Sequence, residues 1–133
     1  MSRDASITLD VPFHDIDILG IVWHGHYYKY FELARTALYR SCELDIGKMQ
    51  EMGYIFPVIE SHCRYVQALK YGQQVSVHAT FDECISYIKI TYSIKDDATG
   101  QRLAYGYTKQ AICKPDGEML MAVPDEVNDA ISR

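Results

Sequence analysis

The chain has 133 residues, of which 48% are hydrophobic, so it can bury one core but hardly a second. We therefore expect a single domain over residues 1–133. Eighteen acidic residues against 13 lysines and arginines give a formal net charge of −5. This charge excludes an overall positive field that could hold a nucleic-acid backbone, so no nucleic-acid partner is expected.

The four cysteines lie far apart in the sequence, without the paired C-x-x-C spacing of a zinc site or the density of a secreted disulfide scaffold. The N-terminal segment MSRDASITLDVPF lacks the apolar run of a signal peptide. No stretch approaches the roughly 18 apolar residues needed to span a bilayer. We expect a cytoplasmic protein with reduced thiols and no membrane span.

Alternating polar and apolar residues at 6–11 predict a short first strand that ends at Pro12. After a polar loop, apolar residues recur every three or four positions from about 25 to 43, as along one face of a helix. That face comprises Tyr27, Phe31, Ala34 and Leu38. A shorter helical piece is predicted at 48–52.

The hydrophobic period then changes to two and predicts strands at 55–68, 74–83, 86–95 and 102–113. A turn signal at 96–100 joins the last two strands as a hairpin, and Pro124 is predicted at the first position of a C-terminal helix. One apolar-striped helix beside an antiparallel sheet of about five strands must bury its stripe on that sheet. The fold class predicted is therefore α+β, with a helix layer on a sheet layer.

The segment before the long helix, FHDIDILGIVWHGHYYKYFELAR, has an unusual density of reactive side chains. Residues 14–26 contain two carboxylates, three histidines and two glycines. A helix N-terminus leaves backbone N–H groups unpaired at the positive end of the helix dipole, where they can polarise a carbonyl oxygen. A carboxylate beside such a site could attack the carbonyl or activate a water molecule.

The same segment resembles the signature of the 4-hydroxybenzoyl-CoA thioesterase family and its acyl-CoA thioesterase relatives, including the small bacterial enzyme associated with the Tol-Pal system. The matching pattern is D-x-D-x-x-G-x-V-x-H-x-x-Y-x-x-x-F-E-x-A-R over residues 15–35. The order of the predicted elements also resembles the family's hotdog fold, in which an antiparallel sheet wraps one long central helix.

This resemblance implies that Asp17 is the catalytic carboxylate and that a backbone N–H near His24 holds the thioester carbonyl oxygen. His24 itself matches an active-site histidine proposed for the Tol-Pal-type branch. The remaining site residues implied by the pattern are assigned to substrate binding: Gly20, Val22, Gly25 and Tyr27. One departure is Phe13, because the Tol-Pal-type branch often has a tyrosine at this place.

The implied reaction is hydrolysis of an acyl thioester, either an acyl-CoA or an acyl carrier protein thioester. Asp17 acts as the nucleophile or as the base for water, and the sequence does not separate these roles. No metal or organic cofactor is expected, because hydrolysis of an activated thioester needs neither. The uncovered aromatic surface of a one-helix, one-sheet protein, together with the family's intersubunit pockets, implies a homodimer or homotetramer.

Several other interpretations of these residues stay open. Asp15 and Asp17 are also the kind of residues that satisfy backbone N–H groups in turns. Glu32 and Arg35 are three apart on the helix and form either a surface ion pair or, with Glu32 as base, an alternative catalytic centre. The ligand types for a metal site are present as well, in His14, Asp15, Asp17, His24 and His26.

Two further functions compete with hydrolysis. A hotdog dehydratase acting on a hydroxyacyl thioester needs a histidine opposed to a carboxylate, a pair that His24 and Glu32 could supply. A non-catalytic acyl-binding module would keep the fold without turnover. The D-x-D segment disfavours the dehydratase, and Asp17 disfavours the pure binder, which has no need of a carboxylate at the scissile carbon.

Overall fold

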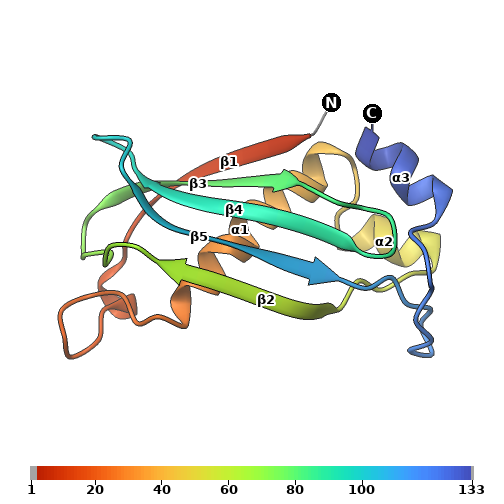
Figure 1. The fold of residues 1–133 in the computed structure, drawn as a ribbon, viewed down its shortest axis with the longest axis horizontal. Coiled ribbons are helices and arrows are strands. Elements are labelled where there is room, and N and C mark those ends of the chain that lie inside the picture. Colours follow the sequence, from red (N-terminus) through yellow and green to blue (C-terminus); the bar gives the residue numbers. More distant parts are fainter. Residues whose placement is uncertain (1–2, 133) are drawn as a thin grey trace.

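A computed structural model describes residues 3–132 as one antiparallel sheet with helices packed on and around it (Figure 1). The strands are β1 Asp4–Asp10, β2 Val58–Tyr65, β3 Gln74–Phe81, β4 Ile88–Asp96 and β5 Arg102–Gln110. The helices are a 3₁₀ turn η1 Phe13–Asp15, then α1 His26–Ser41, α2 Ile46–Met52 and α3 Asp125–Ser132. This is the α+β class expected from the sequence.

The strand order across the sheet is β1-β3-β4-β5-β2, and every neighbouring pair is antiparallel. The predicted hairpin at 96–100 is confirmed, since β4 and β5 pair along their length and the Asp96 side chain accepts hydrogen bonds from the backbone of Ala98 and Thr99. The two edge strands are β1 and β2. They are consecutive strands in the chain, with only helices between them, but they lie at opposite edges of the sheet.

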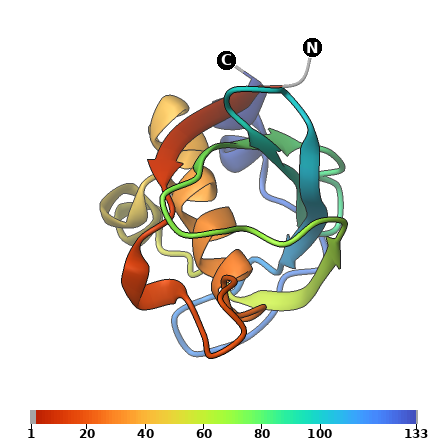
Figure 2. The ribbon, with the colours of Figure 1, turned by 90° about the vertical axis from the view of Figure 1, so that its left-hand side faces the viewer.

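Helix α1 packs against β1 and β3, and Figure 2 shows the strands curving around it. The predicted apolar stripe is confirmed, because its four residues are all at most 2% exposed: Tyr27, Phe31, Ala34 and Leu38. Phe31 stacks on Tyr92 of β4 with ring centroids 4.5 Å apart. Burying this stripe against the sheet supplies the main hydrophobic stabilisation of the helix.

The inner faces of β3 and β4 follow the predicted alternation, with every second side chain buried under α1: Val75, Val77, Ala79, Phe81, Ile88, Ile90, Tyr92 and Ile94. All four cysteines are free thiols. Within the described part of the chain, no helix is both long and apolar enough to cross a membrane.

The ends of some elements differ from the sequence prediction. Helix α3 begins at Asp125, so Pro124 is the residue before the helix and not its first residue. Its carbonyl oxygen accepts the backbone N–H groups of Val127 and Asn128, which is the role of an N-cap residue. The strands predicted at 55–68 and 102–113 are shorter, because regular pairing of β2 with β5 covers only Val58–Tyr65 and its partners.

Strand β2 is the least covered part of the sheet. It pairs with β5 along one edge only, and most of its side chains are exposed, including Ile59 and Tyr65. Helix α1 lies over the opposite half of the sheet, against β1 and β3. An uncovered edge strand presents unpaired backbone groups and apolar side chains, both of which favour pairing with another chain.

Candidate active site

Asp17 begins a tight loop between η1 and α1. Its backbone N–H donates to the Ile21 carbonyl (2.9 Å), and its own carbonyl accepts from the Gly20 N–H (3.0 Å). Gly20 has φ of +81°, a left-handed conformation that side-chain-bearing residues rarely adopt. The Asp17 carboxylate accepts the Leu19 N–H through Oδ1 (2.8 Å) and is partly exposed. Within residues 3–132, no hydrogen bond engages its Oδ2.

A hollow of about 250 Å³ opens beside this loop. Four of the predicted site residues line it: Asp17, Val22, His24 and Tyr27. Its opposite wall is the end of β2 and the chain after it, from Tyr65 to Ala68. Gly20 and Gly25 do not line the hollow. They belong to the loop and helix start whose other residues do.

Tyr65 is a residue of this hollow that the sequence analysis missed. Its hydroxyl donates to the carbonyl oxygen of His24 (3.1 Å), and its ring meets the Tyr27 ring edge-on at 4.7 Å. Burial raises the pKa of the Tyr65 phenol to about 12, so the hydroxyl is a proton donor at neutral pH. Tyr27 in turn accepts the Leu69 N–H at its hydroxyl (3.2 Å). These bonds connect the end of β2 to the start of α1.

No side chain caps the N-terminus of α1. Gly25 is the N-cap residue and makes no side-chain hydrogen bond to the first turn. The Trp23 ring lies so close to Gly25 that a Cβ added there would be 2.2 Å from a ring carbon. Any side chain at this position would therefore force the Trp23 ring to move. The N–H groups of His26 and Tyr27 donate to the Trp23 carbonyl (3.0 Å) and the His24 carbonyl (3.3 Å). Among residues 3–132, the backbone donors left at the helix start are therefore those of His24 and Gly25, next to a hollow that also contains a carboxylate.

Asp15 has a different environment, although it is only two residues from Asp17. Its side chain is 1% exposed and accepts hydrogen bonds from Lys29 Nζ (2.6 Å) and the Tyr30 hydroxyl (2.6 Å). Burial by itself raises the pKa of this carboxyl, but the bonds from Lys29 and Tyr30 and the charges of Lys29 and His26 hold it below its ordinary value. Asp15 thus ties the loop to the first turns of α1.

The metal-site interpretation does not fit this geometry. His14 Nε2 and His26 Nε2 lie 3.6 Å and 3.8 Å from Asp15 Oδ1, but the Lys29 ammonium already lies 2.6 Å from the same oxygen. A metal cation would have to displace a positive charge that hydrogen-bonds its ligand. Among residues 3–132 no three side chains of the ligating types are grouped so that they could hold a metal ion.

Glu32 and Arg35 lie elsewhere. Both line a second hollow, of about 440 Å³, between α1 and α2, together with Phe56 and Gln110. Gln110 is buried there and donates to the Phe56 carbonyl (2.7 Å). Glu32 does not share the Asp17 hollow, so the two candidate catalytic carboxylates belong to separate hollows of one chain.

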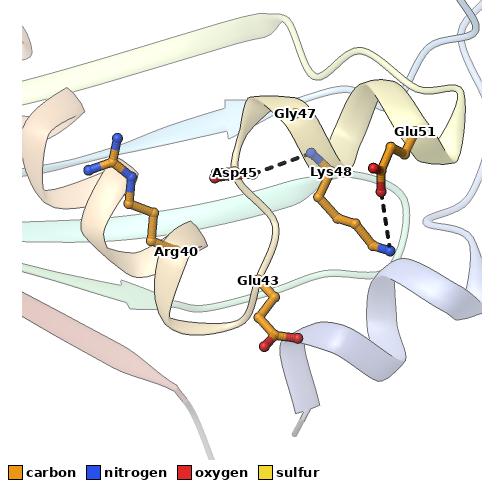
Figure 3. A pocket seen from close by; sticks show the side chains of 6 residues that line it. All are labelled: Arg40, Glu43, Asp45, Gly47, Lys48 and Glu51. Atoms are coloured by element: carbon orange, nitrogen blue, oxygen red, sulfur yellow. Dashed lines mark hydrogen bonds and ion pairs between the residues drawn. The ribbon is translucent and has the colours of Figure 1, made fainter.

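A third hollow, of about 540 Å³, lies at the C-terminal end of α1 (Figure 3). Its lining is mostly charged, and Asp45, Lys48 and Glu51 have partners within the chain. Asp45 caps α2 by accepting the Lys48 N–H (3.3 Å), and Lys48 Nζ lies 3.6 Å from a Glu51 carboxylate oxygen. These contacts give Asp45, Lys48 and Glu51 a role in stabilising α2. The larger size of this hollow is therefore by itself no argument for a catalytic site.

Comparisons with known proteins agree with the fold. Residues 11–131 match the family model described as the thioesterase-like superfamily. A relative in Aquifex aeolicus, named as an esterase, is 32% identical over 91% of this chain and 92% of its own. A Bacillus subtilis relative, YneP, named as an acyl-CoA thioesterase, is 28% identical over 84% of this chain and 68% of its own.

A solved structure of a 4-hydroxybenzoyl-CoA thioesterase mutant in complex with 4-hydroxybenzoyl-CoA has the same fold, with a TM-score of 0.86. It is 18% identical to this chain, and the match covers 97% of this chain and 99% of that one.

The fold is thus the hotdog fold, and the relatives and structural neighbours described here are named as an esterase or as thioesterases, enzymes that hydrolyse acyl thioesters. The chain belongs to the thioesterase-like superfamily. The resemblance of residues 15–35 to the 4-hydroxybenzoyl-CoA thioesterase signature is therefore confirmed as far as the superfamily and the fold.

Proposed function

We propose that this protein hydrolyses acyl-CoA thioesters in the hollow beside Asp17, with Asp17 as the catalytic carboxylate. The observation that supports this most strongly is the pairing of two groups in one hollow. A partly exposed carboxylate lies next to the uncapped N-terminus of α1, and His24 at that N-terminus lines the same hollow. Thioester hydrolysis requires both an electrophilic site for the carbonyl oxygen and a nucleophile or base.

The substrate carbonyl oxygen would accept hydrogen bonds from backbone N–H groups at His24 and Gly25. Asp17 Oδ2 then either attacks the carbonyl carbon, giving an acyl anhydride that water hydrolyses, or takes a proton from an attacking water. In both routes the thiolate leaves, and the net products are a carboxylic acid and free CoA. Tyr65 is a positioning residue in this scheme, because it holds the His24 carbonyl and with it the backbone of the helix start.

The dehydratase alternative is less well supported. A dehydratase needs a histidine and a carboxylate opposed across one substrate, but His24 and Glu32 line different hollows of the chain. A non-catalytic acyl-binding module would not need a partly exposed carboxylate on the wall of its binding site, because burying substrate against that charge costs free energy.

We also propose that the working form is a homodimer or homotetramer in which β2 is covered. Strand β2 has one unpaired edge and exposed apolar side chains, and Tyr65 at its end belongs to the Asp17 hollow. Light scattering should give a mass of at least twice 15.3 kDa at micromolar concentration. A stable monomer under these conditions would contradict this assignment.

The test of function is a hydrolysis screen with aliphatic and aromatic acyl-CoA thioesters beside acyl carrier protein thioesters of the same acyl groups. Release of free thiol from at least one acyl-CoA, with saturable kinetics, supports the proposal. Turnover of acyl carrier protein thioesters alone would show that these, and not acyl-CoA thioesters, are the substrates. Thiol release abolished by a chelator and restored by one divalent ion would overturn the metal-free mechanism.

A further inference from the structure

Three side chains on the outer face of the sheet, the face turned away from α1, form a row of polar contacts. The Ser6 Oγ lies 2.6 Å from Nδ1 of His78, and Nε2 of His78 lies 3.3 Å from Oδ2 of Asp4. Asp4 and Ser6 lie on β1, and His78 lies on β3. We call these three residues the β1–β3 triad. A hydroxyl, an imidazole and a carboxylate in this order of contact are the groups of a nucleophilic triad.

The pairing of β1 with β3 brings the serine and the histidine together. Ser6 is directly opposite His78 in the register of the two strands. The ladder hydrogen bonds fall on the odd-numbered residues of this part of the chain, since the Phe81 N–H donates to the carbonyl of Arg3 (3.2 Å). Ser6 and His78 are therefore a non-hydrogen-bonded pair, whose Cα atoms are about 4.5 Å apart and whose side chains are close.

The same register turns the backbone N–H of Ser6 toward the open edge of the sheet. Strand β1 is an edge strand, and its one neighbour in the sheet is β3. Because the N–H of a non-hydrogen-bonded residue points away from the paired strand, that of Ser6 has no ladder partner within residues 3–132. A backbone donor beside a nucleophilic oxygen can stabilise the oxyanion that forms when an acyl carbonyl is attacked.

The contacts of His78 suit a general base. Its Nε2–H donates to Asp4 in the tautomer that leaves Nδ1 as the acceptor of the Ser6 proton. The side chains of His78 and Asp4 are 42% and 58% exposed, and Ser6 is exposed too, so small molecules reach the hydroxyl. Ser76 on β3 provides a contrast, because its Oγ donates to a carboxylate, Asp97 Oδ1 (2.7 Å), and not to a histidine.

The β1–β3 triad is separate from the Asp17 hollow. Ser6 lies four residues before the end of β1, a distance of about 13 Å along an extended strand. The loop that contains Asp17 comes only after that end, and Figure 1 shows the start of β1 and this loop at opposite ends of the molecule. No residue of the triad lines any of the three hollows described above.

We propose that the β1–β3 triad is a second acyl-transfer site, at which Ser6 reacts with small activated esters. The Ser6 oxygen bonds to the acyl carbon while its proton passes to His78 Nδ1, and the ester C–O bond then breaks as His78 returns that proton to the leaving oxygen. Water attacks the resulting acyl-serine with His78 again as base, which releases a carboxylic acid and restores the Ser6 hydroxyl. Asp17 takes no part, so the inference does not depend on the proposed function.

Hydrolysis of p-nitrophenyl acetate by the Asp17→Asn protein tests the inference, because this background lacks the carboxylate of the proposed thioesterase site. Adding Ser6→Ala or His78→Gln should lower kcat/KM about tenfold or more, since each removes a group that makes or activates the nucleophile. The matched control Ser76→Ala should leave kcat/KM unchanged. An unchanged rate in Ser6→Ala, or an equal loss in Ser76→Ala, would overturn the inference.

Asp4 is a positioning residue in this scheme, because it acts through His78. Asp4→Asn should lower kcat for the same ester about threefold without changing KM, as expected for an exposed ion pair. Asp4→Glu, which keeps the charge, should restore most of the loss. Wild-type kcat in Asp4→Asn would overturn the triad arrangement.

Covalent labelling provides a second measurement that needs no variant of the triad. An activated serine displaces fluoride from a fluorophosphonate and keeps the phosphonyl group on its oxygen. Mass spectrometry of peptides from the labelled wild-type protein should place the group on Ser6, and Asp17→Asn should be labelled there equally fast. No labelling, labelling of another residue instead, or loss of labelling in Asp17→Asn would overturn a separate site at Ser6.

Discussion

Asp15 and Asp17 are two residues apart in one loop, yet the fold gives them opposite surroundings. Asp15 is buried, and both carboxylate oxygens accept hydrogen bonds from side chains of α1. Asp17 is partly exposed on the wall of a hollow, and the hydrogen bond that its side chain makes within residues 3–132 comes from one backbone N–H of its own turn. A carboxylate whose oxygens are all engaged is a structural tether, whereas one with an unengaged oxygen remains available to a substrate.

The largest effect is expected from Asp17→Asn. The amide keeps the shape and can still accept the Leu19 N–H, but it lacks the negative charge needed by a nucleophile or base. We expect kcat to fall about 100-fold or more, equivalent to about 2.7 kcal/mol, with an unchanged free energy of unfolding. Steady-state kinetics and urea unfolding of the same preparation measure both quantities.

Retention of more than about a third of wild-type kcat, combined with inactivity of Glu32→Gln, would move the base to the helix. The matched control in the Asp17 loop is Asp15→Asn, which should affect folding and not chemistry.

Asp15→Asn should have the complementary effect. It removes the charge that Lys29 and Tyr30 bind while leaving a neutral acceptor in the same place. We expect the free energy of unfolding to fall by about 2 kcal/mol, because a buried network loses its ionic partner. The kcat of the folded fraction should stay within a few-fold of wild type. An Asp15→Asn protein of normal stability but without activity would reverse the roles assigned to the two aspartates.

The pH dependence of stability should separate the two aspartates further. The pKa of the Asp15 carboxyl is lowered in the folded state, so its stabilising contribution is complete above its unfolded pKa of about 3.9 and is lost as the pH falls through the lower folded value. Thermal unfolding between pH 6 and pH 2 should therefore show a drop below about pH 4 in the wild type that is smaller in Asp15→Asn. Equal acid sensitivity of both proteins would contradict the tether role.

Gly25→Ala tests the helix start that stands beside Asp17. A methyl group at this position would overlap the Trp23 ring, which must then move. We expect the free energy of unfolding to fall by about 1–2 kcal/mol and kcat to fall as well. Trp23 is the only tryptophan, so a shift in the fluorescence emission reports the ring directly.

Gly47→Ala is the matched control for this change. Gly47 lies in α2, and the nearest atom to an added Cβ there is 3.8 Å away, an ordinary contact. Alanine is favoured over glycine within a helix, so stability should be unchanged or slightly higher. If Gly25→Ala also left the free energy of unfolding, the fluorescence emission and kcat unchanged, the close contact between Trp23 and Gly25 would not matter for stability or catalysis.

The smallest effect is expected from Phe13→Tyr, which restores the hydroxyl usual at this place in the Tol-Pal-type branch. The Phe13 ring is 72% exposed, meets Tyr71 edge-on at 5.5 Å, and does not line the Asp17 hollow. We expect kcat to rise by no more than about threefold. A gain above ~100-fold, about 2.7 kcal/mol, would show that a hydroxyl at this position takes part in the reaction.

The sequence alone predicted the elements whose residues repeat with a clear period. The stripe on α1 and the alternating faces of β3 and β4 were readable because each side chain's burial follows from its position within one element. The sheet order was not readable in this way, since β1 pairs with β3 and β2 with β5 across long stretches of chain. Pairing of distant strands depends on the whole fold, not on local pattern.

The candidate site also has a part that the sequence predicted and a part that only the tertiary structure revealed. Local motif spacing placed Asp17, Val22, His24 and Tyr27 together, because they lie within 11 consecutive residues that form one loop and the first turn of a helix. Tyr65 could not be predicted, because the fold brings it to His24 from 41 residues away along the chain. The different burial of Asp15 and Asp17 was also decided by tertiary structure. Side chains from α1 enclose the first carboxylate and leave the second at the hollow, and no local pattern encodes that packing.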